Sequence, residues 1–83
     1  MTEPEILAKL TTIFQDIFDD TSLVITDRTT AEDVGGWDSV NHVLLVVEVE
    51  RQFKVKFRTA EIEILKNVGD FVGLIAKKTA GKT

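Results

Sequence analysis

Residues 35–53 read Gly-Gly-Trp-Asp-Ser-Val-Asn-His-Val-Leu-Leu-Val-Val-Glu-Val-Glu-Arg-Gln-Phe, and they include the longest apolar run of the chain, residues 43–47. Asp38 is a favourable N-cap, because its carboxylate can accept free N–H groups of a first helical turn and suits the positive end of the helix dipole. Two apolar sets follow at helical spacing: Val40, Val43, Leu44 and Val47, and then Leu45, Val46, Val49 and Phe53. Although β-branched residues favour strands, we predict a helix over residues 38–53, apolar over most of its circumference and largely buried at the centre of the protein.

The sequence before this stretch supplies a helix to pack against it. Apolar residues recur over residues 2–18 at the i, i+3, i+4, i+7 spacing of an amphipathic helix, and Thr2 with Glu5 makes a capping box. Residues 19–37 have no helical period and are rich in Thr, Asp and Gly. We expect them to form a long ordered loop, with Trp37 as the anchor that packs the loop on the bundle.

The sequence after this stretch predicts two more helices. Residues 53–58 alternate apolar and basic side chains, but a lone strand has no partner, so we expect an extended loop. A short helix is expected from Thr59, as its cap, to Leu65, and Asn67 is expected to cap a last helix with Asp70 at its third position. The fold class is therefore all-α, with three main helices, one short helix and a long loop between the first and second.

Length and composition exclude several classes of protein. The 83 residues suffice for one domain, and the absence of cysteine excludes a disulfide scaffold or a thiolate metal site. His42 is the single histidine, and Asp16, Asp19 and Asp20 lack the spacing of a calcium loop, so we predict no metal ligands. The longest apolar run, residues 43–47, is too short to span a bilayer, and the N-terminus is acidic where a secretory signal is basic. We expect a cytoplasmic protein without a membrane partner.

Charge is distributed unevenly along the chain. Residues 1–50 hold eleven acids and two bases, a net −9, whereas residues 51–83 hold three acids and eight bases, a net +5, and the total is −4. An acidic segment favours protein partners with basic docking patches and disfavours phosphate backbones. The basic residues are scattered and lack a platform of exposed aromatic side chains, so we expect no nucleic-acid partner.

Ser39 is the strongest candidate for a functional side chain. A serine in the first turn of a helix can face solvent, and it lies beside free backbone N–H groups and the positive end of the dipole, where a phosphate is stabilised. An Asp-Ser pair before an apolar run is also an ordinary helix start. On that alternative, Ser39 is part of a cap only and the chain is a helical protein-interaction module.

A hydrolase is a further alternative, because Ser39 and His42 are three residues apart and share a helical face. A serine nucleophile needs a base, an orienting acid and an oxyanion hole, and Asp38 is the candidate acid. A domain this small offers little enclosed cleft to exclude water, and a lone histidine at a helix start is more often a surface residue. We therefore predict no catalytic residue.

Residues 36–40, followed by the hydrophobic helix that ends in residues 49–57, resemble the acyl carrier protein family, which carries Asp-Ser-Leu at the start of its second helix. The resemblance covers the whole chain, from the first amphipathic helix and long loop to the final helix. It implies a four-helix acyl-carrier bundle that occupies residues 1–83 as a single domain, with residues 80–83 as a disordered tail.

The resemblance also implies a function. Ser39 matches the serine to which a phosphopantetheinyl transferase attaches 4′-phosphopantetheine from coenzyme A, and Asp38 matches the acid that helps the transferase and its Mg²⁺-bound substrate engage the site. The resemblance implies that the arm would carry acyl groups as thioesters and that the protein would be a group carrier and not an enzyme. We also expect it to be a monomer. Its other expected partners are acyl-loading, ketosynthase or acyltransferase enzymes of fatty-acid, polyketide or related biosynthesis.

Departures from the family pattern point to a specialised stand-alone carrier. Val40 replaces the usual leucine, and acids are few on the second helix, where Leu44 is expected to be an exposed apolar contact. The residues expected to contact partner enzymes are Val40, Asn41, His42, Leu44, Glu48, Glu50 and Arg51. The pair Gly35-Gly36 resembles peptidyl carrier domains, so a peptidyl or aminoacyl carrier is the alternative.

Overall fold

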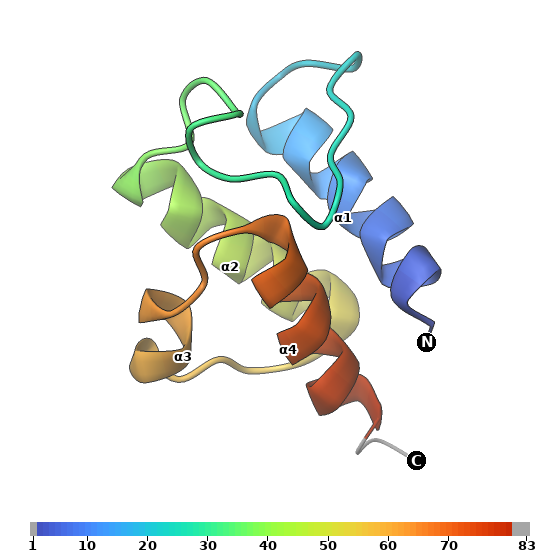
Figure 1. Cartoon of the computed structure of the whole chain (residues 1–83). Helices are drawn as coiled ribbons and strands as arrows, with labels where there is room; N and C mark the ends of the chain where they lie inside the picture. Colours follow the sequence, from blue (N-terminus) through green and yellow to red (C-terminus); the bar gives the residue numbers. More distant parts are fainter. Residues whose placement is uncertain (1, 81–83) are drawn as a thin grey trace.

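The computed structural model describes residues 2–80 and is built from four helices: α1 (Glu3–Ile17), α2 (Ser39–Phe53), α3 (Thr59–Glu63) and α4 (Val68–Ala80) (Figure 1). Helix α1 packs against both α2 and α4. No strand occurs among residues 2–80, where one isolated β-bridge joins Thr30 to Asn67. The predicted all-α, four-helix fold with a long first loop is confirmed. Of the expected tail, Ala80 ends α4 and residues 81–83 lie outside the described residues.

Helix α1 begins with the predicted capping box. The Thr2 hydroxyl accepts the Glu5 N–H at 3.3 Å, and the Glu5 carboxylate accepts the Thr2 N–H at 3.1 Å. These two bonds satisfy backbone donors that a helix start leaves free. The buried face of α1 consists of Ile6, Leu10, Ile13 and Phe14.

Helix α2 has the predicted bounds, but it is not largely buried, and that prediction is wrong. Its buried residues are Leu45, Val46, Val49 and Phe53. The other apolar set is exposed: Val40 by 70%, Val43 by 56%, Leu44 by 47% and Val47 by 53%. With 3.6 residues per turn, the two sets lie on opposite sides of the helix. The rest of the bundle covers one of these sides.

Helix α3 is shorter than expected and is not capped by Thr59. Arg58 holds the N-cap position, and its backbone N–H donates to Glu61 Oε1 at 2.8 Å. Thr59 is the first helical residue, and the helix ends at Glu63, before Leu65. The side chain of Glu61 therefore satisfies the free backbone N–H of the N-cap residue, whereas the predicted Thr59 cap does not form.

Helix α4 begins as predicted and holds the long loop in place. Asn67 Oδ1 accepts the Asp70 N–H at 2.8 Å, and Asp70 Oδ2 accepts the Asn67 N–H at 3.3 Å. The N–H groups of Val68 and Gly69 donate to loop carbonyls, those of Thr29 and Asp27, at 2.8 Å each. The loop before α2 is therefore ordered by backbone bonds to α4.

The aromatic side chains form the part of the core nearest the start of α2. Trp37 is 8% exposed and meets Phe14 edge-on, with ring centroids 5.2 Å apart. Phe71 lies against Trp37 at 6.4 Å. The predicted anchoring of the loop by Trp37 is confirmed, and it fixes the chain two residues before Ser39.

None of the helices within residues 2–80 has the length and apolar character needed to cross a bilayer. Across the same residues, no group of three or more His, Cys, Asp or Glu side chains is arranged to hold a metal ion.

Candidate functional site

Ser39 is the first residue of α2 and is exposed. Asp38 precedes it as the N-cap, and its Oδ1 accepts the Asn41 N–H at 2.9 Å. The Asp38 carbonyl accepts the His42 N–H at 2.8 Å. Helix geometry leaves the earlier N–H groups, those of Ser39 and Val40, without intrahelical partners. The Ser39 hydroxyl thus lies beside free donors at the positive end of α2.

The turn before Asp38 depends on Gly36, which has a φ of +88°. Glycine adopts positive φ without the steric cost that a Cβ brings. The Gly36 carbonyl accepts two hydrogen bonds, one from the Asp38 N–H at 2.9 Å and one from Asn41 Nδ2 at 2.6 Å. These bonds fold the chain back on the first turn of α2, so that Asp38 and Ser39 are presented on a fixed backbone.

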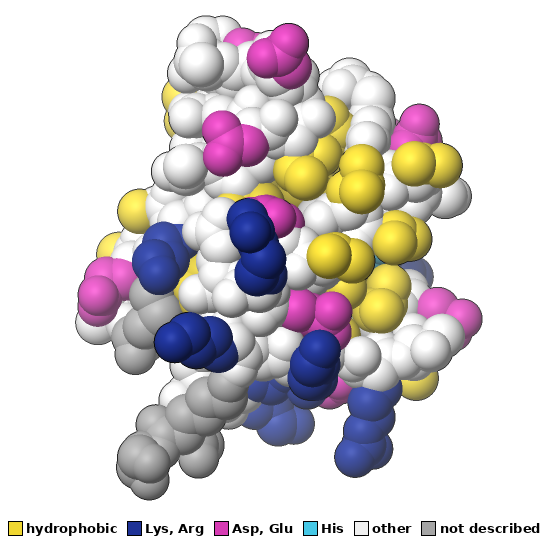
Figure 2. All heavy atoms as spheres, turned by 180° about the vertical axis from the view of Figure 1, so that it is seen from behind, with side chains coloured by type: hydrophobic (Ala, Val, Ile, Leu, Met, Phe, Trp, Pro, Cys, Tyr) yellow, Lys and Arg dark blue, Asp and Glu magenta, His cyan; other side chains and the backbone are white. Residues whose placement is uncertain are grey.

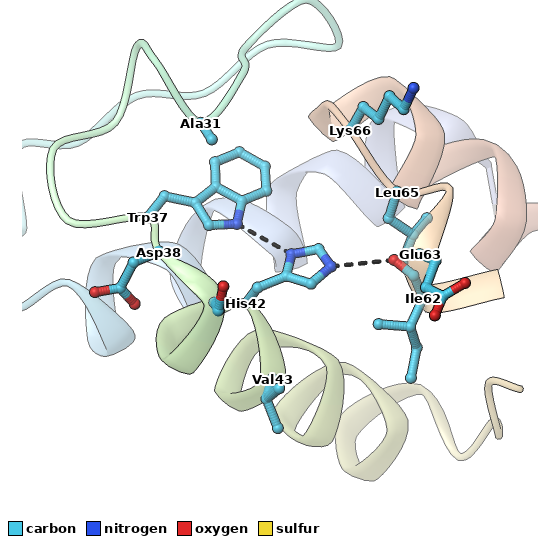
Figure 3. Close-up of a pocket in the computed structure, with 10 residues that line it drawn as sticks. Ala31, Trp37, Asp38, His42, Val43, Ile62, Glu63, Leu65 and Lys66 are labelled. Carbon is cyan, nitrogen blue, oxygen red and sulfur yellow. Dashed lines mark hydrogen bonds between the residues drawn. The ribbon is translucent and has the colours of Figure 1, made fainter. Parts of the chain in front are cut away.

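His42 joins the loop before α2 to helix α3 (Figure 3). The Trp37 indole N–H donates to His42 Nδ1 at 3.1 Å, and His42 Nε2 lies 3.2 Å from the Ile62 carbonyl oxygen. An indole N–H can only donate, so Nδ1 accepts and the proton lies on Nε2, which donates to Ile62. His42 is half-buried, and both ring nitrogens are occupied. In this arrangement neither nitrogen can accept a proton from Ser39, as a hydrolase would require.

A hollow of about 580 Å³ opens beside Ser39, between the start of α2 and the α3 region (Figure 3). Its apolar walls include Trp37, Val43, Ile62 and Leu65. Its polar lining includes Asp38, Glu63 and Lys66. A group attached to Ser39 would therefore have a partly apolar recess within immediate reach.

The exposed apolar set of α2, which we call the α2 ridge, consists of Val40, Val43, Leu44 and Val47. Figure 2 shows hydrophobic side chains gathered on one face of the molecule, with acidic and basic side chains around them. The exposure of Leu44 was predicted. Val43 and Val47 were missed as surface residues, because the sequence assigned them to the core. The available signal was the angular separation of the two apolar sets, since a single helix cannot turn both toward one bundle.

The other predicted contact residues are divided between the surface and internal roles. Arg51 is exposed and forms an ion pair with Glu48, which lowers the pKa of the Glu48 carboxyl first through that hydrogen bond and then through one from Gln52. Glu50 accepts the Phe57 N–H at 2.7 Å and so stabilises the segment after α2. The Asn41 side chain and His42 are likewise engaged within the molecule, by the bonds described above.

Comparison with known proteins gives consistent matches. Residues 8–75 match the family model described as a phosphopantetheine attachment site. The chain is 34% identical over 74 residues to the acyl carrier protein of Thermotoga maritima, a match that covers 89% of this chain and 91% of that protein. It is also similar to the solution NMR structure of a holo acyl carrier protein from Geobacter metallireducens, with a TM-score of 0.85 and 47% identity, over 92% of this chain and 87% of that one.

The cofactor that these matches indicate is covalently bound 4′-phosphopantetheine. The described residues fit such a group. The Ser39 hydroxyl is exposed, a phosphate on it would lie near the free N–H groups of the first turn, and the hollow beside Ser39 offers apolar surface to the arm.

Proposed function

The chain belongs to the acyl carrier protein family, and from this premise we propose that Ser39 is the residue that bears its 4′-phosphopantetheine. The observation that carries the proposal is the position of Ser39, exposed at the start of α2 directly after the N-cap Asp38. The chain has two serines, and the other, Ser22, lies in the long loop, where its hydroxyl donates to Asp20 at 2.6 Å. Ser22 therefore has neither the helix start nor the free donors.

The residues around Ser39 have distinct tasks in this proposal. Ser39 Oγ would lose its proton and form a bond to the pantetheine-side phosphorus of coenzyme A, while the diphosphate P–O bond breaks and adenosine 3′,5′-bisphosphate leaves. The first-turn N–H groups would then stabilise the charge of the phosphodiester. Asp38 Oδ1 is used in the cap, which leaves Oδ2 to approach the Mg²⁺ that a phosphopantetheinyl transferase brings with coenzyme A. The fixed turn at Gly36 holds both side chains in place for the transferase.

The activity that we propose is carriage and not catalysis. The thiol at the end of the arm supplies the thioester link to the acyl group. The protein presents that group to one partner after another, and the tether raises its effective concentration at each active site. His42 takes no part in proton transfer in this scheme, since both of its ring nitrogens are bonded within the protein.

We assign the carrier to fatty-acid, polyketide or related specialised biosynthesis, with the α2 ridge as its contact for acyl-handling enzymes. Charged side chains border the ridge at Glu48 and Arg51, but these two neutralise each other. Binding through such a face depends on apolar burial, which salt weakens little, whereas binding through acids would be screened. The alternative of a peptidyl or aminoacyl carrier is supported by the pair Gly35-Gly36 before the serine.

The experiment that tests this function is enzymatic modification followed by intact-mass measurement. The purified protein is incubated with coenzyme A, Mg²⁺ and a broad-specificity phosphopantetheinyl transferase, alongside the variants Ser39→Ala and Ser22→Ala. We expect one phosphopantetheine on the wild type and on Ser22→Ala, and none on Ser39→Ala. No addition to the wild type with transferases of several types would favour the interaction module instead.

A further inference from the structure

The pair Trp37–His42 forms part of the wall of the hollow beside Ser39. Both residues line the hollow, and their rings are stacked with centroids 6.1 Å apart and planes 21° apart. The hydrogen bonds from Trp37 to His42 and from His42 to the Ile62 carbonyl connect the loop, α2 and α3 in one chain (Figure 3). We call this chain of two bonds the Trp37–His42 latch.

The latch lies between the hollow and the fully buried rings of Phe14 and Phe71. His42 meets Phe71 edge-on at 5.7 Å, and Trp37 meets Phe14 edge-on at 5.2 Å. Phe14 and Phe71 are fully buried. A chain that extends from Ser39 through the hollow toward Phe14 or Phe71 therefore meets the Trp37 and His42 rings first.

Opening the latch is unfavourable without a polar replacement. If α3 moved away from α2, the Ile62 carbonyl and the His42 N–H would lose their bond, and the Trp37 N–H would lose its acceptor if His42 rotated. An alkyl chain inserted between them could satisfy none of these groups, and an unpaired buried donor or acceptor is costly. The polar lining of the hollow, at Asp38, Glu63 and Lys66, also favours a carried group that tolerates polar neighbours.

We propose that the latch limits how far the carried acyl group extends into the bundle, so that this group lies in the hollow and does not enter the core. The inference rests on the proposed function, because the group must be attached at Ser39. It deepens that function by assigning a substrate class: short acyl groups or acyl groups with polar substituents, in preference to long alkyl chains. His42 is the positioning residue, since it makes both bonds.

The test compares two chain lengths on the same protein. A promiscuous transferase loads the wild type from acetyl-coenzyme A or from octanoyl-coenzyme A, intact mass verifies loading, and thermal unfolding is followed by circular dichroism. Each methylene that becomes fully buried should raise Tm by about 3–6 °C. The variants are His42→Ala, which removes the latch, His42→Gln, whose amide offers a donor and an acceptor, and Val72→Ala, which weakens a buried site away from the hollow.

We expect the two loaded wild-type forms to melt within about 3 °C of each other, less than one buried methylene. For His42→Ala, we expect the octanoyl form to melt at least about 6 °C above the acetyl form, whereas His42→Gln and Val72→Ala behave as the wild type. If His42 had only a structural role, His42→Ala would lower the Tm of the acetyl form and of the octanoyl form equally. If His42→Ala does not fold, Trp37→Phe is used in its place, because it removes the indole N–H and keeps an aromatic ring. The same comparison of the Tm values of its acetyl and octanoyl forms then applies.

Two results would overturn the proposal that the latch limits how far the acyl group extends. An octanoyl chain that raises the Tm of the wild type as much as that of the variant shows that the core already admits it. An octanoyl chain that stabilises neither protein shows that the latch is not what limits its depth. Failure of the transferase to load any form is a different result, because it contradicts the proposed function on which the inference rests.

Discussion

At the scale of single residues, Gly69 and Asp38 each have a role that other residue types cannot fill. Gly69 is the second residue of α4, and its N–H donates to the Asp27 carbonyl at 2.8 Å. A Cβ at this position would lie 2.6 Å from the same carbonyl oxygen, closer than any stable contact. Glycine is therefore what allows the long loop to pack on α4 at Asp27.

Gly69→Ala is expected to lower the free energy of unfolding by about 1–3 kcal/mol, the usual cost of forcing atoms into a packed site. Urea denaturation measures this directly. Gly73→Ala is the matched control, because a Cβ there meets nothing within 4 Å. It should raise stability by about 0.5–1 kcal/mol through helix propensity. Equal effects of the two substitutions would contradict the close loop contact.

The two roles of Asp38 can be separated by substitution. Asp38→Asn keeps an oxygen for the Asn41 N–H and should leave stability nearly unchanged, whereas Asp38→Ala loses the cap at a cost of about 1 kcal/mol. Both variants should be modified more slowly by the transferase, since neither can offer a carboxylate to Mg²⁺. Stability comes from urea denaturation and rate from mass spectrometry over time. An Asp38→Asn protein modified at the wild-type rate would show that Asp38 is a cap only.

At the scale of elements, α2 is the helix whose two faces have opposite tasks. The α2 ridge is open, while the set that contains Leu45 and Val49 is buried at 0% exposure. Local sequence predicted the helix and its cap, because both depend on neighbouring residues. It did not predict which apolar face would be covered, since both have helical spacing and the choice depends on where distant segments dock.

Leu44 and Leu45 allow one substitution to be compared on adjacent residues of opposite faces. Leu45→Ala should cost about 2–5 kcal/mol, as for other buried leucines. Leu44→Ala should change stability by less than about 0.5 kcal/mol, as for other surface positions, and should instead weaken partner binding. Thermal and urea unfolding of the two variants provide the comparison. A large loss for Leu44→Ala would mean that the ridge is covered in solution.

The helix starts also predict how stability depends on pH. The Thr2 backbone N–H, followed by its hydroxyl, lowers the pKa of Glu5 below its ordinary 4.5. The Arg58 backbone N–H, followed by Lys78, lowers the pKa of Glu61 in the same way. A carboxyl whose pKa is lower in the folded protein than in the unfolded chain stabilises the fold at pH values above its unfolded pKa. This stabilisation is lost as the pH falls through its folded pKa.

We therefore expect the free energy of unfolding to decrease as the pH is lowered from about 5 to about 3. The double variant Glu5→Gln, Glu61→Gln should be less stable than the wild type at neutral pH and should lose less stability on acidification. Urea denaturation at several pH values measures both slopes. Parallel slopes for the two proteins would rule out these capping carboxylates as a source of the acid sensitivity.

At the scale of the whole molecule, the site combines features that are close in sequence with features that are distant. The Asp38–Ser39 helix start and the family resemblance were readable from consecutive residues. The bond between His42 and the Ile62 carbonyl joins residues twenty apart, and the hollow beside Ser39 requires α3 to lie against the start of α2. No local pattern specifies these contacts, so the sequence could not predict the half-buried position of His42 or its two partners.

The proposed carrier function depends on attachment of the arm at Ser39. The most direct measurement is peptide fragmentation by mass spectrometry of the protein after transferase treatment with coenzyme A. We expect the phosphopantetheine on the peptide that contains Asp38-Ser39, with fragment masses that place it on Ser39. Its location on Ser22 or on any threonine, or its absence from every peptide, would contradict the account.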